Sequence, residues 1–319
     1  MIKILANDGI HPDGKMLLEE AGYQVDTEKV AQEDLMDVLP NYDAIIVRSA
    51  TKVRKDLIDG CPNLKVIARA GVGLDNIDHD YARDKGLAVI NTPAASSQSV
   101  AELAFGHMFS LARQLQNSNW EMRNLEEGKF KKLKKQYSTG FQLRGKTLGI
   151  IGFGRIGIET ARIGLGLGMK VLPYDIIPDL KVDVDVSIYQ SEEASLTIKL
   201  KSVELDELLA NSDFISLHIP TSDRPVIGKA EIEKLKDGVI LVNTARGNMI
   251  DEEALIEGLE SGKIGGAALD VFVNEPNPNE AILQHPKIAL SPHIGGSTVE
   301  AQTNIGLELA DKIIAHFGH

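Results

Sequence analysis

Three motifs in the last quarter of the chain carry side chains suited to proton transfer and charge stabilisation. They are NTARGNMID, which holds Arg246, LDVFVNEP, which holds Glu275, and SPHIGGST, which holds His293. Each comes at or just after the end of a predicted strand, and open α/β sheets bind their ligands at the carboxyl ends of their strands. We therefore expect these three side chains to serve one site.

These residue types suit the transfer of a hydride from a carbon that also carries a hydroxyl group. Such a step needs a base for the hydroxyl proton, a cation for a carboxylate and a developing oxyanion, and a group that orients the base. We assign these catalytic roles to His293, Arg246 and Glu275 in that order. Each residue also has an ordinary alternative: a surface ion pair for Arg246, a loop charge for Glu275 and a cap beside Pro292 for His293.

A glycine-rich turn predicts a dinucleotide site. Gly152, Gly154 and Gly157 directly follow an apolar strand and open a helix, an order in which glycines allow a tight turn and a close approach to a pyrophosphate. Asp175 ends the next strand, where an acid binds the adenosine ribose and disfavours a 2′-phosphate. The sequence therefore predicts NAD rather than NADP. A glycine-rich loop without a ligand is the alternative.

The elements that must position these residues form two βα series in tandem. Strands are predicted first at 2–5, 44–47, 66–68 and 87–90, and then at 147–152, 170–174, 214–218, 239–244, 266–271 and 288–291. Most of the second series is almost continuously apolar, as in parallel strands covered on both faces. The sequence thus indicates an α/β protein.

Two capping-box patterns and one ambiguous segment complete the organisation. Ser99 with Glu102 predicts the start of a helix at a domain boundary, and Ser297 with Glu300 predicts the start of the last helix. Residues 180–202 mix alternating apolar residues with charge, which fits an irregular excursion or a surface hairpin.

Composition limits the possible partners. At 319 residues the chain is long enough for two domains. A net charge of −12 opposes nucleic-acid and anionic-membrane binding, and the histidines show no spacing typical of a metal site. The lone Cys61, with no targeting leader or membrane span, favours a cytoplasmic protein.

Further motifs run in order through nearly the whole chain. They are VRSATKV (47–53), ARAGVGLDNID (68–78), NTP (91–93), SVAEL (99–103), GFGRIG (152–157), LHIP (217–220), TARG (244–247), ALDVF (268–272), NEP (274–276) and PHIGGST (292–298). With them, the chain resembles the D-isomer-specific 2-hydroxyacid dehydrogenase family. The resemblance implies two doubly wound parallel-sheet domains, a flavodoxin-like substrate domain (1–98 plus 295–319) and a Rossmann NAD domain (99–294), with the active site in the cleft between them.

The resemblance also implies the residues that contact each ligand. Those for the cofactor NAD are Val72, Val100, Gly152, Gly154, Arg155, Ile156, Gly157, Asp175, His218, Ile219, Thr244, Ala245, Arg246, Asp270, His293, Gly295 and Gly296. Those for the substrate are Arg48, Ser49, Arg69, Gly71, Val72, Gly73 and Asn76, together with Arg246 and His293.

Within the family the chain is most similar to the D-3-phosphoglycerate dehydrogenases, in a short form without a C-terminal regulatory domain. This similarity implies NAD-dependent oxidation of 3-phospho-D-glycerate to 3-phosphohydroxypyruvate, the first step of L-serine biosynthesis. Arg48 and Arg69 would bind the phosphate, since arginine contacts phosphate through two nitrogens. The alternative for Arg69 is an ion pair with a nearby carboxylate.

Two other functions stay open. One is a glyoxylate or hydroxypyruvate reductase, or another D-2-hydroxyacid dehydrogenase, which would share every catalytic residue. The other, of a different class, is an NADH-sensing binding protein similar to transcriptional corepressors. The basic run Lys129–Lys135 lies where relatives build a dimerisation arm, which implies a homodimer, although such runs are usually solvated loops.

Overall fold

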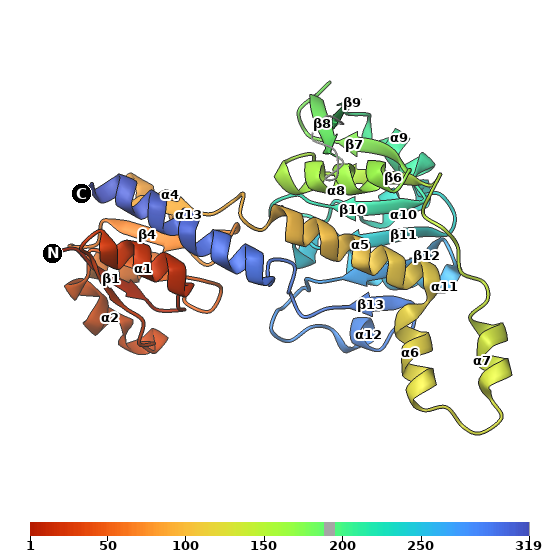
Figure 1. Ribbon diagram of the computed structural model, residues 1–319, viewed down its shortest axis with the longest axis horizontal. Coiled ribbons are helices and arrows are strands. Elements are labelled where there is room, and N and C mark those ends of the chain that lie inside the picture. The colour runs from red at the N-terminus through yellow and green to blue at the C-terminus, as the bar shows by residue number, and fades with distance from the viewer. Residues whose placement is uncertain (188–194, 319) are drawn as a thin grey trace. The chain divides into compact units, whose positions relative to one another are not determined.

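The computed structural model describes residues 1–187 and 195–318, and the chain divides into two compact units (Figure 1). Unit 1 consists of Met1–Ser99 and Gly296–His319, and unit 2 consists of Val100–Gly295. Each unit is built on its own parallel sheet, so the predicted α/β class with two parallel sheets is confirmed. In the described part of the chain, no helix combines the length and the apolar character needed to cross a membrane.

Unit 1 contains a five-stranded sheet in the order β2-β1-β3-β4-β5, with every neighbouring pair parallel. The chain moves to one side of β1 for β2 and to the other for β3, so the strand order reverses between β1 and β3. We call such a place the switch point, and ligands of open α/β sheets bind there. The strands are β1 (Lys3–Ala6), β2 (Gln24–Asp26), β3 (Ala44–Val47), β4 (Val66–Arg69) and β5 (Ala88–Asn91).

The strands of unit 1 bury alternate side chains on opposite faces, as a strand must. Ile4 and Ile46 pack on the face covered by α1 and α13, and Leu5 and Ile45 pack on the other face. A Cβ at Gly14 of α1 would lie 2.4 Å from a carbonyl oxygen of α13, so the two helices cross closely. The helices are α1 (Pro12–Glu20), η1 (Gln32–Asp34), α2 (Leu35–Val38), η2 (Leu39–Asn41), α3 (Lys55–Gly60), α4 (His79–Asp84) and α13 (Val299–Phe317).

Unit 2 contains a six-stranded sheet in the order β13-β12-β11-β10-β6-β7, again all parallel, with its switch point between β6 and β10. Separate apolar clusters cover its two faces, and α5 lies over one of them (Figure 1). The strands are β6 (Thr147–Ile151), β7 (Lys170–Tyr174), β10 (Phe214–Leu217), β11 (Val239–Asn243), β12 (Ile264–Leu269) and β13 (Ile288–Leu290). The helices are α5 (Ser97–Arg113), α6 (Leu115–Arg123), α7 (Phe130–Gln136), α8 (Arg155–Gly166), α9 (Leu205–Asn211), α10 (Lys229–Lys234), η3 (Gly247–Met249), α11 (Glu252–Ser261) and α12 (Glu280–Leu283).

The ambiguous segment contains an antiparallel strand pair, β8 (Lys181–Ser187) and β9 (Ser195–Lys201). Val184 is fully buried, and Val182 packs against the same core cluster, so the alternating apolar side chains extend the core of unit 2. The pair is therefore part of the packed structure and not an irregular excursion. Residues 188–194, between the two strands, lie outside the described residues.

Both predicted helix starts were wrong, by three residues for α5 and by one residue for α13. Helix α5 begins at Ser97, so Ser99 lies within its first turn, where its hydroxyl contacts the Thr298 hydroxyl at 2.9 Å. Helix α13 is capped by Thr298, whose side chain accepts a hydrogen bond from the amide of Ala301, and not by Ser297. A hydroxyl caps a helix only where it reaches an amide of the first turn.

Candidate active site

The glycine turn of unit 2 lies at its switch point. Gly152 directly follows β6 with a φ of +93°, and a Cβ there would lie 2.6 Å from the carbonyl oxygen of His218. A Cβ at Gly157 would lie 2.2 Å from the Gly152 carbonyl oxygen, whereas one at Gly154 would meet nothing within 4 Å. The turn is therefore closed toward the sheet and open at Gly154, where the N-terminus of α8 presents its backbone amides.

Asp175 ties the end of β7 to this turn. One carboxylate oxygen accepts a hydrogen bond from the amide of Phe153 at 2.9 Å, and the other accepts one from the amide of Ile177 at 3.1 Å. The structure thus places the predicted acid beside the glycine turn. Its carboxylate also helps to hold the turn in shape.

His218 follows β10 and lies behind the glycine turn. Its Nε2 lies 3.0 Å from the hydroxyl of Thr160 on α8 and 2.9 Å from that of Ser216 on β10. Burial lowers the pKa of His218 to about 3, so the imidazole is neutral at physiological pH. The contact joins the first turns of α8 to the sheet.

The same edge of the sheet has room for the polar groups of a cofactor. His218 Nδ1 and the hydroxyl of Thr244, which follows β11, are buried and have no hydrogen-bond partner within the described residues. Buried polar atoms are usually satisfied, so such atoms indicate a missing ligand or water. Together with the open turn at Gly154, they fit a dinucleotide.

Arg246 and Glu275 lie on loops that touch. A Cβ at Gly247, next to Arg246, would lie 2.0 Å from the backbone of Phe272, so only glycine permits this approach. The amide of Phe272 in turn donates to Glu275 Oε1 at 2.9 Å, and Arg246 donates to the carbonyl oxygen of Ala245 at 2.7 Å. Close backbone packing at Gly247 therefore brings the two loops together.

Glu275 and His293 form the predicted pair. Glu275 Oε2 lies 2.7 Å from His293 Nδ1, and the imidazole remains about half exposed. Because Nδ1 faces the carboxylate, Nε2 is the nitrogen left for a substrate. His293 itself has a φ of +55°, a left-handed conformation that a side chain with a Cβ adopts only where its surroundings hold it.

A buried polar chain holds the backbone next to His293. Asp270, which is 1% exposed, accepts hydrogen bonds from the amides of Ile294 and Gly295 at 2.9 and 2.8 Å and from the hydroxyl of Ser291 at 2.6 Å. His107 Nε2 of α5 lies 2.8 Å from the same hydroxyl. Burial lowers the pKa of His107, although Asp270 acts to raise it. Sequence reasoning missed His107 and Ser291, which nothing local links to this loop.

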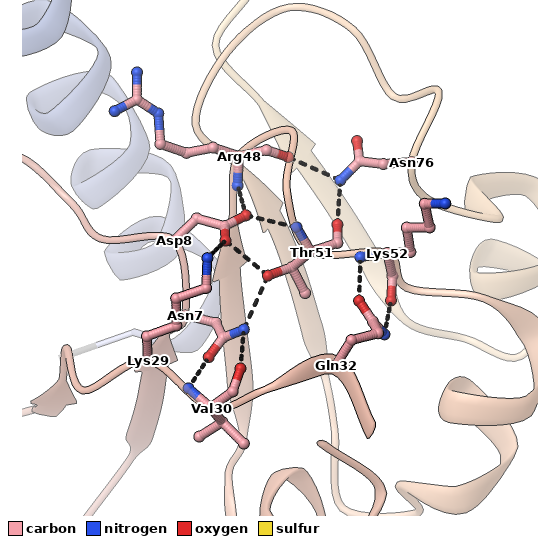
Figure 2. Close-up of polar contacts among 9 residues, drawn as sticks. All are labelled: Asn7, Asp8, Lys29, Val30, Gln32, Arg48, Thr51, Lys52 and Asn76. Carbon is pink, nitrogen blue, oxygen red and sulfur yellow. Dashed lines mark hydrogen bonds and ion pairs between the residues drawn. The ribbon is translucent and has the colours of Figure 1, made fainter. Parts of the chain in front are cut away.

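In unit 1 the structure brings Arg48 and Asn76 together around the loop that follows β3. The Asn76 side-chain amide donates to the carbonyl oxygens of Arg48 and Thr51 at 2.8 and 2.6 Å (Figure 2). Ser49, which follows Arg48 in the loop, is exposed. The carboxylate of Asp8, which was not predicted, holds the same loop from the other side. The only sequence signal for it was a polar turn after the first strand.

Arg69 ends β4 and packs on its own loop. Its Nη1 donates to the carbonyl oxygen of Ala70 at 2.5 Å, and a Cβ at Gly71, where φ is +145°, would lie 2.4 Å from that nitrogen. The guanidinium thus covers the space left by the absent Gly71 side chain. Asn91 donates to the carbonyl oxygen of Val72 at 2.7 Å and supports the exposed end of the loop.

Comparison with known proteins identifies the family. Residues 105–295 match the NAD binding domain of D-isomer specific 2-hydroxyacid dehydrogenases. The chain belongs to this family. It is therefore an NAD-binding oxidoreductase whose substrate is a small 2-hydroxy or 2-oxo acid, and the enzyme and cofactor predictions are confirmed.

Individual relatives differ in their names and lengths. The chain is 44% identical to a hydroxypyruvate reductase of Thermotoga maritima, over 99% of this chain and 98% of that protein. It is 39% identical to a D-3-phosphoglycerate dehydrogenase of Archaeoglobus fulgidus over 98% of this chain, and it spans only 57% of that protein. The structure matches a glyoxylate reductase of Paecilomyes thermophila with a TM-score of 0.82 and 30% identity, covering 98% of this chain and 94% of that one.

Proposed function

We propose that this enzyme is an NADH-dependent reductase of an unphosphorylated 2-oxo acid, hydroxypyruvate or glyoxylate. The observation that carries this proposal is the position of Arg69. Its guanidinium lies against Ala70 and Gly71 of its own loop, where it stabilises the backbone. This favours a structural role for Arg69 over phosphate binding. The similarity to the Thermotoga maritima protein, over almost the full length of both chains, supports the same substrate class.

The proposed roles of the catalytic residues follow from the geometry of unit 2. When bound, NADH supplies the hydride that adds to C2 of the oxo acid. His293 delivers a proton from Nε2 to the carbonyl oxygen, so that the oxo group becomes a hydroxyl group. Glu275, whose Oε2 lies 2.7 Å from Nδ1, orients the imidazole. Arg246 binds the substrate carboxylate and stabilises negative charge on the reacting oxygen.

Arg48 supports a second candidate, the oxidation of 3-phospho-D-glycerate. Its guanidinium extends away from the polar contacts that hold its backbone (Figure 2), so it is positioned to meet a distal group of a substrate. A phosphate would suit a guanidinium, and the similarity to the Archaeoglobus fulgidus protein agrees with this reading.

Substrate preference separates the two candidates. The ratio kcat/KM with NADH is measured for hydroxypyruvate, glyoxylate and 3-phosphohydroxypyruvate in one buffer, and with NAD for the corresponding hydroxy acids. We expect hydroxypyruvate or glyoxylate to be preferred by about tenfold or more. A preference for the phosphorylated acid of about 100-fold would establish the second candidate instead.

We also propose that the enzyme forms a homodimer through α6 and α7. Tyr137 and Gln136 bond Glu121 and hold the two helices side by side, apart from the sheet of unit 2 (Figure 1). This arm exposes large apolar side chains, and Trp120 is 70% exposed. A contiguous exposed apolar surface usually marks an interface. A second copy suits it because the lysines of α7 complement a chain with a net charge of −12.

Light scattering after gel filtration tests the dimer. The protein should elute with the mass of two chains, and Trp120→Glu should shift it to the mass of one. Met16→Glu, at another exposed apolar position, should leave the dimer intact. A monomer at high concentration would refute the proposed interface.

A further inference from the structure

The switch point of unit 1 is filled by a carboxylate of the chain itself. Asp8, two residues after β1, accepts hydrogen bonds from the backbone amides of Arg48 at 2.8 Å and Thr51 at 3.0 Å. It also accepts one from the Thr51 hydroxyl at 2.8 Å, and its side chain is only 3% exposed. At this place of an open α/β sheet, such amides commonly bind an anion from solution. In this protein the carboxylate of Asp8 takes the place of such an anion.

The surrounding contacts hold the same loop from several sides (Figure 2). Asn7 donates to the Thr51 hydroxyl at 2.9 Å, and Asn76 donates to the carbonyl oxygens of Arg48 and Thr51. Lys29 lies 3.8 Å from Asp8 and partly balances its charge. Asp8 alone accepts from both backbone amides, so the shape of the loop depends most on its carboxylate.

We propose that Asp8 is a positioning residue for substrate binding. By fixing the amides of Arg48 and Thr51, it presents the Arg48 side chain and Ser49 to the oxo acid and so sets the KM for that substrate. The inference rests on the proposed function in that the loop is taken to bind the oxo acid. Asp8 itself does not touch the substrate.

The variant Asp8→Ala tests this role by removing the carboxylate. Both amides donate to the same carboxylate oxygen, Oδ2, which an asparagine could still offer them, whereas alanine leaves both amides and the Thr51 hydroxyl without this acceptor. We expect the KM for hydroxypyruvate to rise about tenfold or more, while kcat stays within about twofold and the Kd of NADH does not change. Asp26→Ala, at a carboxylate of unit 1 that accepts a hydrogen bond from Tyr42 and not from this loop, is the matched control.

Hydrogen exchange measures the positioning without any substrate. In Asp8→Ala the amides of Arg48 and Thr51 should exchange at least tenfold faster than in the wild type, whereas in Asp26→Ala the same two amides should exchange at the wild-type rate. In Asp8→Gly, added formate should slow this exchange again, because it can occupy the vacated anion position. Unchanged exchange in Asp8→Ala, or an unchanged KM in a protein that reduces oxo acids, would overturn the proposal. If the wild-type protein reduces none of the acids, the proposed function fails, and the exchange data still decide whether Asp8 holds the loop.

Discussion

The two units share one strand order, but the residues at their switch points differ. In unit 2 the first strand is followed directly by Gly152, and the turn is open at Gly154. In unit 1 the first strand is followed by Asn7 and Asp8, whose side chains fill the corresponding position. One switch point is open, and we propose that it binds an external anion, the cofactor diphosphate. The other is closed by an internal carboxylate.

The difference shows how one topology serves two kinds of ligand. Glycine at the end of the first strand lets a ligand approach the backbone amides, so the binding energy comes from the ligand's own phosphates. A carboxylate at that place satisfies the amides internally, and in the proposed function the loop then binds a small acid through its side chains. On this proposal, the residues that follow the first strand decide which kind of ligand each unit binds.

Loss of His293 should have the largest effect on turnover. We expect His293→Ala to lower kcat by about 10² to 10⁴, the usual range for a lost general acid or base, while the Kd of NADH changes little. Single-turnover kinetics and NADH fluorescence measure the two quantities. His285→Ala, at a partly exposed histidine outside the proposed site, is the control. Near-normal turnover in His293→Ala would refute the proposed proton transfer.

Two glycine variants test whether cofactor binding requires the open turn at the switch point of unit 2. Gly154→Ala adds a methyl group that meets nothing in the protein, so stability should not change, but the Kd of NADH should rise about 10- to 100-fold because the backbone approach is blocked. Gly157→Ala places its methyl group 2.2 Å from a carbonyl oxygen and should cost about 1–3 kcal/mol of stability. Urea unfolding and cofactor titration separate the two effects. Tight NADH binding by Gly154→Ala would contradict the open-turn interpretation.

Asp175 should set the preference for NADH over NADPH. Its charge opposes a 2′-phosphate, so we expect Asp175→Ala to reduce the ratio of kcat/KM for the two cofactors by about tenfold. Any loss of kcat/KM with both cofactors would come partly from the amide of Phe153, which loses its hydrogen-bond acceptor in this variant. Asp179→Asn, an exposed carboxylate near the same edge, should keep the wild-type ratio. An unchanged ratio in Asp175→Ala would remove Asp175 as the selector.

Disrupting the buried polar contacts that join His107, Ser291 and Asp270 should lower turnover only modestly. Ser291→Ala removes one of the three donors to a buried carboxylate that holds the loop after His293, and we expect kcat to fall about three- to tenfold. Ser291→Thr keeps the hydroxyl and should restore kcat. Ser212→Ala, a buried serine bonded within α9, is the control. If Ser291→Thr loses as much activity as Ser291→Ala, packing and not the hydroxyl is responsible.

How much the sequence could predict depended on whether the signal was local. Most of the parallel strands were found because burial on both faces makes them continuously apolar, whereas the short edge strand β2, Gln24–Asp26, was missed. The glycine turn was found because its residues are close in sequence. The contact between His107 and Ser291 joins residues 184 positions apart, and Asp8 acts on an amide 40 positions away, so no local pattern reveals either. The exact helix starts were missed because each has more than one nearby hydroxyl, and the tertiary partner decides which one caps.

His218, the neutral histidine behind the glycine turn, should make the stability of the fold depend on pH. With a folded pKa of about 3 for His218, the unfolded chain takes up a proton below pH 6.5 that the folded chain does not, so stability falls as the pH decreases from 6.5 toward 3. Well below pH 6.5 this amounts to about 1.4 kcal/mol per pH unit for one proton. His107, whose pKa is also lowered, adds to the same slope. Urea unfolding from pH 6.5 to 5.0 should therefore show a shallower slope for His218→Asn than for the wild type, with the His107 contribution remaining. An equal slope in both proteins would mean that His218 gains a proton in the folded state, and the switch point of unit 2 would then carry a positive charge in acid that attracts the cofactor diphosphate.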